Sequence, residues 1–284
     1  MKLIECPRDA IQGIDHFIPT ANKIEYLNEL IEAGFDTIDF GSFVSPKAVP
    51  QMADTAEVLK GLNLGERKTK LLAIVANERG AEEALQYEEI TYLGYPFSVS
   101  ETFQRRNTNA GIAESMERVK AIQDLCSRKN RELVIYISMG FGNPYGDDWN
   151  AEIALSWVDK LRKFGIRTFS LADTIGVADP EIISYLFGNL IPAYPDLEFG
   201  AHLHSRPDNW REKIQAAWEA GCRRFDGAIM GYGGCPFAAD ELVGNIATEN
   251  LIVFFREEGI ATIEPERLTR LQQSFQKLVA TVLT

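Results

Sequence analysis

Short apolar runs alternate with longer amphipathic stretches along the 284-residue chain. The runs have the length and the β-branched and aromatic content of buried strands, and the stretches between them repeat apolar positions at helical spacing. The predicted strands are 2–6, 36–40, 70–76, 95–99, 133–139, 166–172, 198–204 and 222–228. Residues 88–93 compete with 95–99 for the fourth strand. The predicted helices include 21–33, 111–129, 150–164, 209–220, about 239–256, and 264–282.

Alternation of strand and helix predicts parallel strand pairing with helical crossovers. Eight such units in about 250 residues are typical of a (β/α)8 TIM barrel. We therefore expect one catalytic α/β barrel domain over residues 1–284, with an extra C-terminal helix. A doubly wound open sheet is the alternative. No GxGxxG motif follows the first predicted strand, which disfavours a dinucleotide-binding version of that sheet.

The composition excludes several classes of function. A net charge of −12 without a basic run argues against binding to nucleic acid or to anionic membranes. No apolar run reaches the roughly 18 residues of a membrane-spanning helix, and the N-terminal residues do not resemble a secretory leader. The four cysteines are scattered, without a CxxC pair. We therefore expect a cytoplasmic protein with reduced thiols and no nucleic-acid or membrane partner.

Polar residues gather where the predicted strands end, which is where (β/α)8 enzymes carry their active sites. Arg8 and Asp9 follow the first strand, Asp39 ends the second and Asp173 follows the sixth. A surface ion pair for Arg8 and Asp9, and a helix cap for Asp173, are the structural alternatives. Their shared position at one end of the barrel favours a common site.

Two histidines at the end of the seventh predicted strand indicate a metal site. His202 and His204 are two residues apart, so in a strand both side chains would point to the same face. A hydrogen-bonded pair in the core is the alternative. Asn245, after the eighth strand, could add a carbonyl oxygen, and Asp9 a carboxylate. This mixed set suits a divalent ion; the oxygens favour Mg²⁺ and the histidines Mn²⁺ or Zn²⁺, so the metal stays open.

A cysteine stands in the glycine-rich segment MGYGGCPFA, residues 230–238. Glycines would let such a loop close over a substrate, and the thiol of Cys235 could take part in proton transfer because its ordinary pKa is near 8.5. A cysteine in a flexible turn is the structural alternative.

Taken in order, several segments resemble the motifs of the 3-hydroxy-3-methylglutaryl-CoA (HMG-CoA) lyase family. The segments are PRDAIQ, GSFVSPKAVPQM, SVSETFQRRN, ADTIGVADP, HLH, GYGGCPFA and GNIATEN. The resemblance covers about residues 2–255. It implies cleavage of HMG-CoA to acetyl-CoA and acetoacetate with Mg²⁺ or Mn²⁺, as in leucine and ketone-body catabolism. An acyl-CoA substrate follows from this resemblance, and analogy with similar barrels predicts a homodimer.

The resemblance also implies a role for each candidate residue. Arg8 would stabilise the thioester enolate, and Cys235 would take part in proton transfer. The implied metal ligands are Asp9, His202, His204 and Asn245. The implied supporting acids are Asp39, Asp173 and Glu249. The implied acyl-CoA contacts are Ser98, Ser100, Glu101 and Asn107.

The chain departs from the family pattern at several places; among them, Cys6 and Ala10 replace the usual glycines around PRD, and Asn143 replaces a cysteine. Ser205, Arg206 and Pro207 follow the second histidine where the family usually has Asp-Thr-Tyr, and Asp39 stands where the family usually has glutamate. Three alternative functions remain. A Claisen-type synthase or a hydroxy-acid aldolase would share the metal site but would lack the GGCP loop. A binding module would hold a metal and an acid without turnover.

Overall fold

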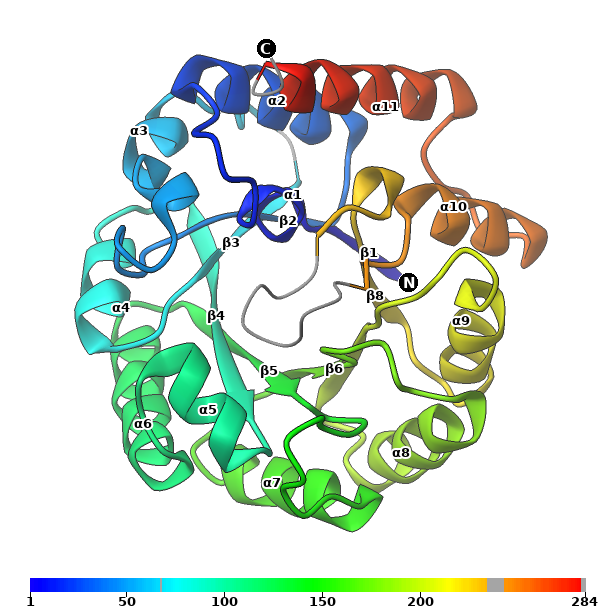
Figure 1. Ribbon diagram of the computed structural model, residues 1–284. Helices are drawn as coiled ribbons and strands as arrows, with labels where there is room; N and C mark the ends of the chain where they lie inside the picture. The colour runs from blue at the N-terminus through cyan, green and yellow to red at the C-terminus, as the bar shows by residue number, and fades with distance from the viewer. Residues whose placement is uncertain (67, 234–242, 282–284) are drawn as a thin grey trace.

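The computed structural model describes residues 1–66, 68–233 and 243–281. Eight parallel strands form a closed barrel in sequence order, and β1 pairs with β8 to complete it (Figure 1). The strands are β1 (Lys2–Glu5), β2 (Thr37–Ser42), β3 (Lys70–Ile74), β4 (Ile90–Ser98), β5 (Glu132–Ser138), β6 (Thr168–Ala172), β7 (Glu198–His202) and β8 (Arg224–Gly227). The predicted (β/α)8 barrel is confirmed, and the open sheet is wrong because β1 and β8 are paired.

Helices surround the barrel, as Figure 1 shows. The longer ones are α2 (Thr20–Ala33), α6 (Ile112–Arg128), α7 (Ala151–Arg162), α8 (Pro180–Ala193), α9 (Trp210–Glu219), α10 (Thr248–Glu257) and α11 (Pro265–Ala280). The shorter ones are α1 (Pro7–Ile11), α3 (Thr55–Lys60), α4 (Glu78–Ala84), α5 (Glu101–Thr108) and the 3-10 turns η1 (Pro50–Met52) and η2 (Ile229–Gly231). The extra C-terminal helix α11 lies beside α2. None of the described helices is both long and apolar enough to cross a membrane.

Most predicted elements are present, and many of their bounds shift by one or more residues. The competing segments for the fourth strand largely belong to one nine-residue strand, β4. The predicted strand 198–204 ends at His202, because Ser205 N donates to Gly244 O and Ile246 N donates to Leu203 O outside the barrel. The helix predicted from about 239 begins only at Thr248; residues 243–247 are not helical, and 239–242 lie outside the described residues.

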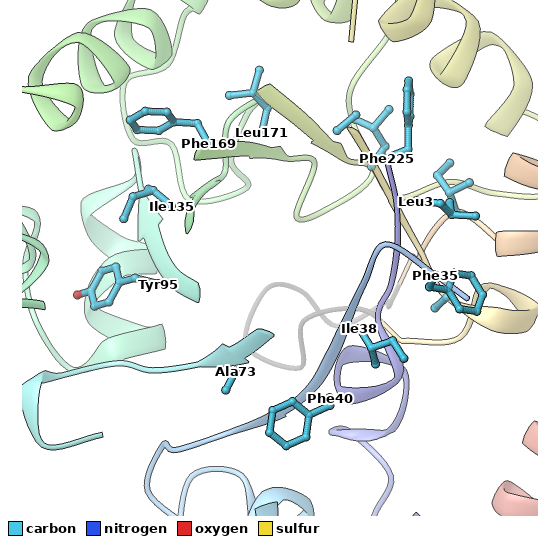
Figure 2. Packing of buried hydrophobic residues seen from close by; sticks show 14 of the residues in the cluster. Leu3, Phe35, Ile38, Phe40, Ala73, Tyr95, Ile135, Phe169, Leu171 and Phe225 are labelled. Atoms are coloured by element: carbon cyan, nitrogen blue, oxygen red, sulfur yellow. The ribbon is translucent and has the colours of Figure 1, made fainter. Parts of the chain in front are cut away.

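The strands contribute side chains to two separate apolar clusters. Figure 2 shows apolar side chains such as Leu3, Ile38 and Phe169 around the barrel wall, where they are buried in the cluster that the strands share with the helices. A separate apolar cluster joins β3, β4 and β5, and consists of Leu72, Ile74, Tyr92, Val134 and Tyr136. Polar residues of β7 and β8 (His202 and Asp226) contact each other. The apolar cluster of β3–β5 and the polar pair of β7 and β8 therefore belong to different strands of the barrel.

Candidate active site

Arg8 is the centre of a buried ion-pair network that joins the carboxyl end of β1 to Asp39. Asp39 lies inside β2 and does not end it, because the strand continues to Ser42. Arg8 lies in α1, one residue after Pro7 at the first helical position, so the chain turns immediately after β1. Its Nη2 donates to Asp39 Oδ2 at 2.5 Å and its Nε to the same oxygen at 3.0 Å. Its Nη1 donates to Asp9 Oδ1 at 3.1 Å and to Gln12 Oε1 at 3.0 Å. One N–H of Nη2 has no partner within the described part of the chain, which leaves a donor for a ligand.

Three of the predicted metal ligands come together. Donor atoms of Asp9, His202 and His204 all lie within 4.8 Å of one another, and the three side chains are buried. Within the described residues, neither ring nitrogen of His204 has a hydrogen-bond partner. A buried imidazole without a partner is costly, so this arrangement fits a ligand that is a divalent cation.

Asn245, the fourth candidate metal ligand, contacts Asp9. Its Nδ2 donates to Asp9 Oδ2 at 2.6 Å and to Tyr232 O at 2.9 Å. The amide nitrogen is thereby occupied, and the carbonyl oxygen is left for a cation. An isolated antiparallel bridge joins His204 to Asn245. This bridge explains why His204 lies beyond the end of β7 and still faces the site.

The charge states of Asp9 and His204 suit a metal. Burial alone would raise the pKa of Asp9, but Arg8 and the two histidines lower it to about 2. Burial lowers the pKa of His204 to about 3, and His202 adds to the effect. Burial would lower the pKa of Arg8, yet Asp39 and Asp9 raise it above its ordinary value. A carboxylate and a neutral imidazole are the forms that bind metal ions.

Asp226 on β8 is a residue of this site that the sequence analysis missed. Its Oδ2 lies 3.1 Å from His202 Nδ1 and accepts a hydrogen bond from Ser170 Oγ at 3.3 Å. A proton on Nδ1 leaves Nε2 of His202 free for the metal, as in other carboxylate–histidine pairs behind metal ions. The signal was the alternation of Arg224 and Asp226 in a strand, which places both side chains on the same face.

Asp173 lies behind the site and is held by Lys213, a second residue that the sequence analysis missed. Lys213 Nζ donates to Asp173 Oδ2 at 2.7 Å, to Gly176 O at 3.0 Å and to His204 O at 2.8 Å. Asp173 Oδ1 also accepts from Ala178 N at 3.0 Å. The buried cation next to His204 is thus Lys213. Arg206, from the segment that departs from the family pattern, instead pairs with Asp208 at the surface.

Glu249 holds the turn that follows β8. Both of its carboxylate oxygens accept from Met230 N at 3.0 Å, and Oε1 accepts from Gln272 Nε2 at 2.7 Å. Among the described residues, Glu249 therefore bonds to the backbone of η2 and to α11. Cys235 lies outside the described residues, so its role stays a prediction.

A cavity of about 430 Å³ opens over the cluster. Arg8, Asp9, His202 and His204 line it on one side, and Asn107 of α5 lines it on another. The other predicted acyl-CoA contacts shape the start of α5. Ser100 caps the helix by accepting from Phe103 N, Ser98 Oγ accepts from Ser100 N, and Glu101 accepts from Ile112 N. The acyl-CoA roles of all four residues stay predictions.

The closed barrel and the histidine–carboxylate cluster at the carboxyl ends of its strands define a (β/α)8-barrel protein with a candidate metal centre. The family model described as HMGL-like matches residues 3–277. The chain therefore belongs to the HMGL-like family.

Individual relatives are similar over nearly the whole chain. Hydroxymethylglutaryl-CoA lyase YngG of Bacillus subtilis is 33% identical over 259 residues, which cover 90% of this chain and 85% of that protein. (R)-citramalyl-CoA lyase of Chloroflexus aurantiacus is 31% identical over 265 residues, which cover 90% of this chain and 83% of that protein.

Solved structures agree with these relatives. An HMG-CoA lyase from Acinetobacter baumannii, in complex with coenzyme A and 3-methylmalate, superimposes with a TM-score of 0.91. It is 31% identical, and the match covers 99% of this chain and 91% of that one.

Proposed function

We propose that this protein is a carbon–carbon lyase that cleaves HMG-CoA to acetyl-CoA and acetoacetate with a divalent metal ion. The observation that carries the proposal is the convergence of Asp9, His202 and His204 beside Arg8 at the wall of one cavity. The names of the relatives supply the substrate, since several are hydroxymethylglutaryl-CoA lyases.

The candidate ligands Asp9, His202, His204 and Asn245 would hold the metal ion. When bound there, a divalent cation supplies Lewis-acid chemistry to a substrate hydroxyl. Mg²⁺ and Mn²⁺ are the ions we propose, because carboxylate, amide and imidazole ligands suit them together.

Arg8 would stabilise the enolate that forms on the thioester oxygen. Cleavage of the C2–C3 bond of HMG-CoA leaves negative charge on that oxygen, and a fixed guanidinium donor lowers the energy of such a charge. Asp39 supports this role because it holds Nε and one N–H of Nη2 in place. The remaining Nη2 donor is the one we assign to the substrate. Cys235 stays our candidate for proton transfer to the enolate carbon.

A second candidate substrate is citramalyl-CoA. The relative named (R)-citramalyl-CoA lyase is 31% identical to this chain, and the B. subtilis lyase is 33% identical. Sequence identity therefore does not decide between the two candidate substrates. Both substrates carry a tertiary hydroxyl, a carboxylate and a thioester, and both release acetyl-CoA. They differ in the second product, which is acetoacetate from HMG-CoA and pyruvate from citramalyl-CoA.

The test is an incubation of the purified protein with each acyl-CoA in the presence of Mg²⁺ or Mn²⁺. Acetyl-CoA with acetoacetate supports the HMG-CoA assignment, and acetyl-CoA with pyruvate supports the alternative. An EDTA-treated sample is the control, since loss of product there ties cleavage to the metal. A metal-loaded, folded protein that releases neither product would point to a binding module.

We also propose a homodimer located in the cytoplasm and a place in leucine or ketone-body catabolism. The catabolic role follows the family resemblance, the homodimer follows analogy with similar barrels, and the cytoplasmic location follows from the scattered cysteines. Light scattering on the purified chain tests the dimer, because a mass of one 31.8 kDa chain would contradict it.

A further inference from the structure

Glu5 is a buried acid that the proposed reaction does not use. It ends β1 and is fully buried. Its Oε1 accepts a hydrogen bond from Ile229 N at 2.8 Å, and its Oε2 lies 2.5 Å from Thr248 Oγ1. One carboxyl group therefore joins the start of the barrel to the turn after β8 and to the first residue of α10.

The turn that Glu5 holds has an unusual backbone. Met230 has φ of 62°, and Gly231 and Gly233 have φ of 67° and 104°. A non-glycine residue such as Met230 rarely adopts this left-handed conformation, so neighbouring contacts must hold it. Two acids from distant parts of the chain do so, since Glu5 accepts from Ile229 N and Glu249 from the next amide, Met230 N.

The same turn touches two of the candidate metal ligands. Tyr232 O accepts from Asn245 Nδ2 at 2.9 Å. A Cβ atom on Gly233 would lie 2.5 Å from Asn245 Nδ2 and 2.8 Å from Asp9 O, so the turn is packed tightly against both residues. A displacement of the turn would therefore remove one of the two acceptors, Tyr232 O and Asp9 Oδ2, that hold the Asn245 amide in the orientation that leaves its carbonyl oxygen free.

We propose that Glu5 is a positioning residue of the metal site: through the Ile229 amide it keeps the 229–233 turn where Tyr232 O orients the side chain of Asn245. The inference uses the metal site proposed above and does not depend on the acyl-CoA reaction.

Glu5 performs this role as a neutral acid. Burial raises its pKa to about 8, the hydrogen bonds from Thr248 and Ile229 oppose the rise, and the charge of Glu249 adds to it. The titratable groups that face it are Glu249 on α10, Tyr26 on α2 and Cys6 next to it in the chain. Ionised Glu5 would add a second negative charge near Glu249, and no described cation is among the groups that act on Glu5, so this repulsion would displace the turn.

The experiment measures Mn²⁺ affinity by calorimetry between pH 6.5 and 9 for the whole chain and its variants. Glu5→Gln keeps the neutral shape and the acceptor for Ile229, so it should bind Mn²⁺ as the wild type does at pH 7. Above pH 8 the wild type should lose affinity while Glu5→Gln does not. Glu5→Val removes the acceptor and should bind about tenfold more weakly at pH 7, the lower end for partners that orient metal ligands.

Asp36→Asn is the matched control. The Asp36 carboxylate also accepts from a β1 amide, Leu3 N, but at the opposite end of the strand. This variant should show wild-type affinity and a wild-type pH profile. The proposal is overturned if Glu5→Gln and Glu5→Val also match the wild type across the whole range.

Two further outcomes are decided by the same samples. If Glu5→Val does not fold, the pH profile of Glu5→Gln alone decides. If the wild type binds no Mn²⁺, the metal site of the proposed function is wrong, and amide hydrogen exchange at Ile229 and Met230 decides the positioning role. Above pH 8, and after correction for intrinsic rates, faster exchange in the wild type than in Glu5→Gln supports the positioning role of Glu5. Equal exchange contradicts that role.

Discussion

Asp9 and Glu5 are four residues apart and both are buried, yet near pH 7 Asp9 is ionised and Glu5 is neutral. The pKa of Asp9 is about 2 and that of Glu5 is about 8. Burial favours the neutral acid at both positions. The difference lies in the neighbours, because Asp9 faces Arg8 and two histidines, whereas Glu5 faces neutral donors and Glu249.

This contrast explains how a barrel keeps a carboxylate available for a metal ion inside its core. A cation that is itself held in place must accompany the carboxylate, and here Asp39 holds Arg8. Without such a cation, the same burial produces a neutral group that hydrogen-bonds to backbone and hydroxyl partners, as Glu5 does. One strand end therefore supplies both a candidate metal ligand and a structural acid.

Replacing Arg8 by methionine should have the largest effect, because it removes the cation from the Asp9 environment. Asp9 and Asp39 would remain buried without a counter-charge, and breaking such a pair costs about 3–5 kcal/mol of stability. Turnover of HMG-CoA should fall by about 10²–10³-fold, as for loss of a donor to a developing oxyanion. Urea denaturation and a product assay measure the two effects.

Arg8→Lys is the control for charge alone. It should recover part of the stability but little of the turnover, since lysine lacks the fork that bonds Asp39 and Asp9 together. Stability and turnover close to wild type in Arg8→Met would remove Arg8 from its assigned role.

Lys213→Met breaks the second buried ion pair near the site. Asp173 would be left without its cation, and His204 O and Gly176 O without their donor. We expect a loss of about 3–5 kcal/mol in the free energy of unfolding. The double variant Lys213→Met/Asp173→Leu should be more stable than the single one, because no charge is left unpaired. Equal stability of the two variants, measured in urea, would show that the charge pair is not what Lys213 contributes.

The contributions of Asp9 and Glu5 to the free energy of unfolding should change with pH in opposite directions. The folded pKa of Asp9 is lowered from 3.8 to about 2, so in metal-free protein its contribution is present above about pH 4 and lost as the pH falls towards 2. The size is roughly 2 kcal/mol at 1.36 kcal/mol per pKa unit. The folded pKa of Glu5 is raised from 4.5 to about 8, so its contribution is complete below pH 4.5 and is lost as the pH rises to 8.

Thermal melting of wild type, Asp9→Asn and Glu5→Gln over this pH range measures both contributions. The stability difference between the wild type and Asp9→Asn should grow in favour of the wild type from pH 2 to 4. The difference between the wild type and Glu5→Gln should shift against the wild type from pH 5 to 8. If both stability differences changed with pH in the same direction, the contrast between Asp9 and Glu5 would be wrong.

Asp226→Asn should have the smallest effect on stability among the changes described above. The variant can no longer hold the Nδ1 proton of His202 with a charged acceptor, so the ring loses its preferred orientation for the metal. We expect metal affinity to fall by about 10–100-fold with little change in melting temperature. A variant with wild-type affinity would show that the Asp226 hydrogen bond is structural only.

The sequence alone predicted the barrel, because the alternation of strands and helices is a local pattern. It also predicted Arg8, Asp9 and His202 at one end, since each follows or ends a strand. It missed Glu5, Asp226 and Lys213. Glu5 stands inside the apolar run KLIEC, and its partner Ile229 is 224 positions away. Only the closure of β1 onto β8 brings the two together.

The same reason accounts for the boundaries that were wrong. The strand ending at His204 and the helix starting near 239 followed from local periodicity. In the structure, residues 203–205 leave the barrel to pair with 244–246, a contact between distant segments. Local pattern therefore located the candidate metal ligands along the chain, whereas tertiary pairing brings Asn245 beside His204.

The most direct test of the central claim is a metal titration coupled to product analysis. Metal-depleted protein is titrated with Mn²⁺ in the presence of HMG-CoA, and acetoacetate and acetyl-CoA are quantified at each step. We predict that cleavage appears with the metal, saturates at one ion per chain and is lost in His204→Ala together with the tight binding of the ion. Folded protein that cleaves HMG-CoA equally well without metal, or that binds one ion and forms no acetoacetate, would contradict the account.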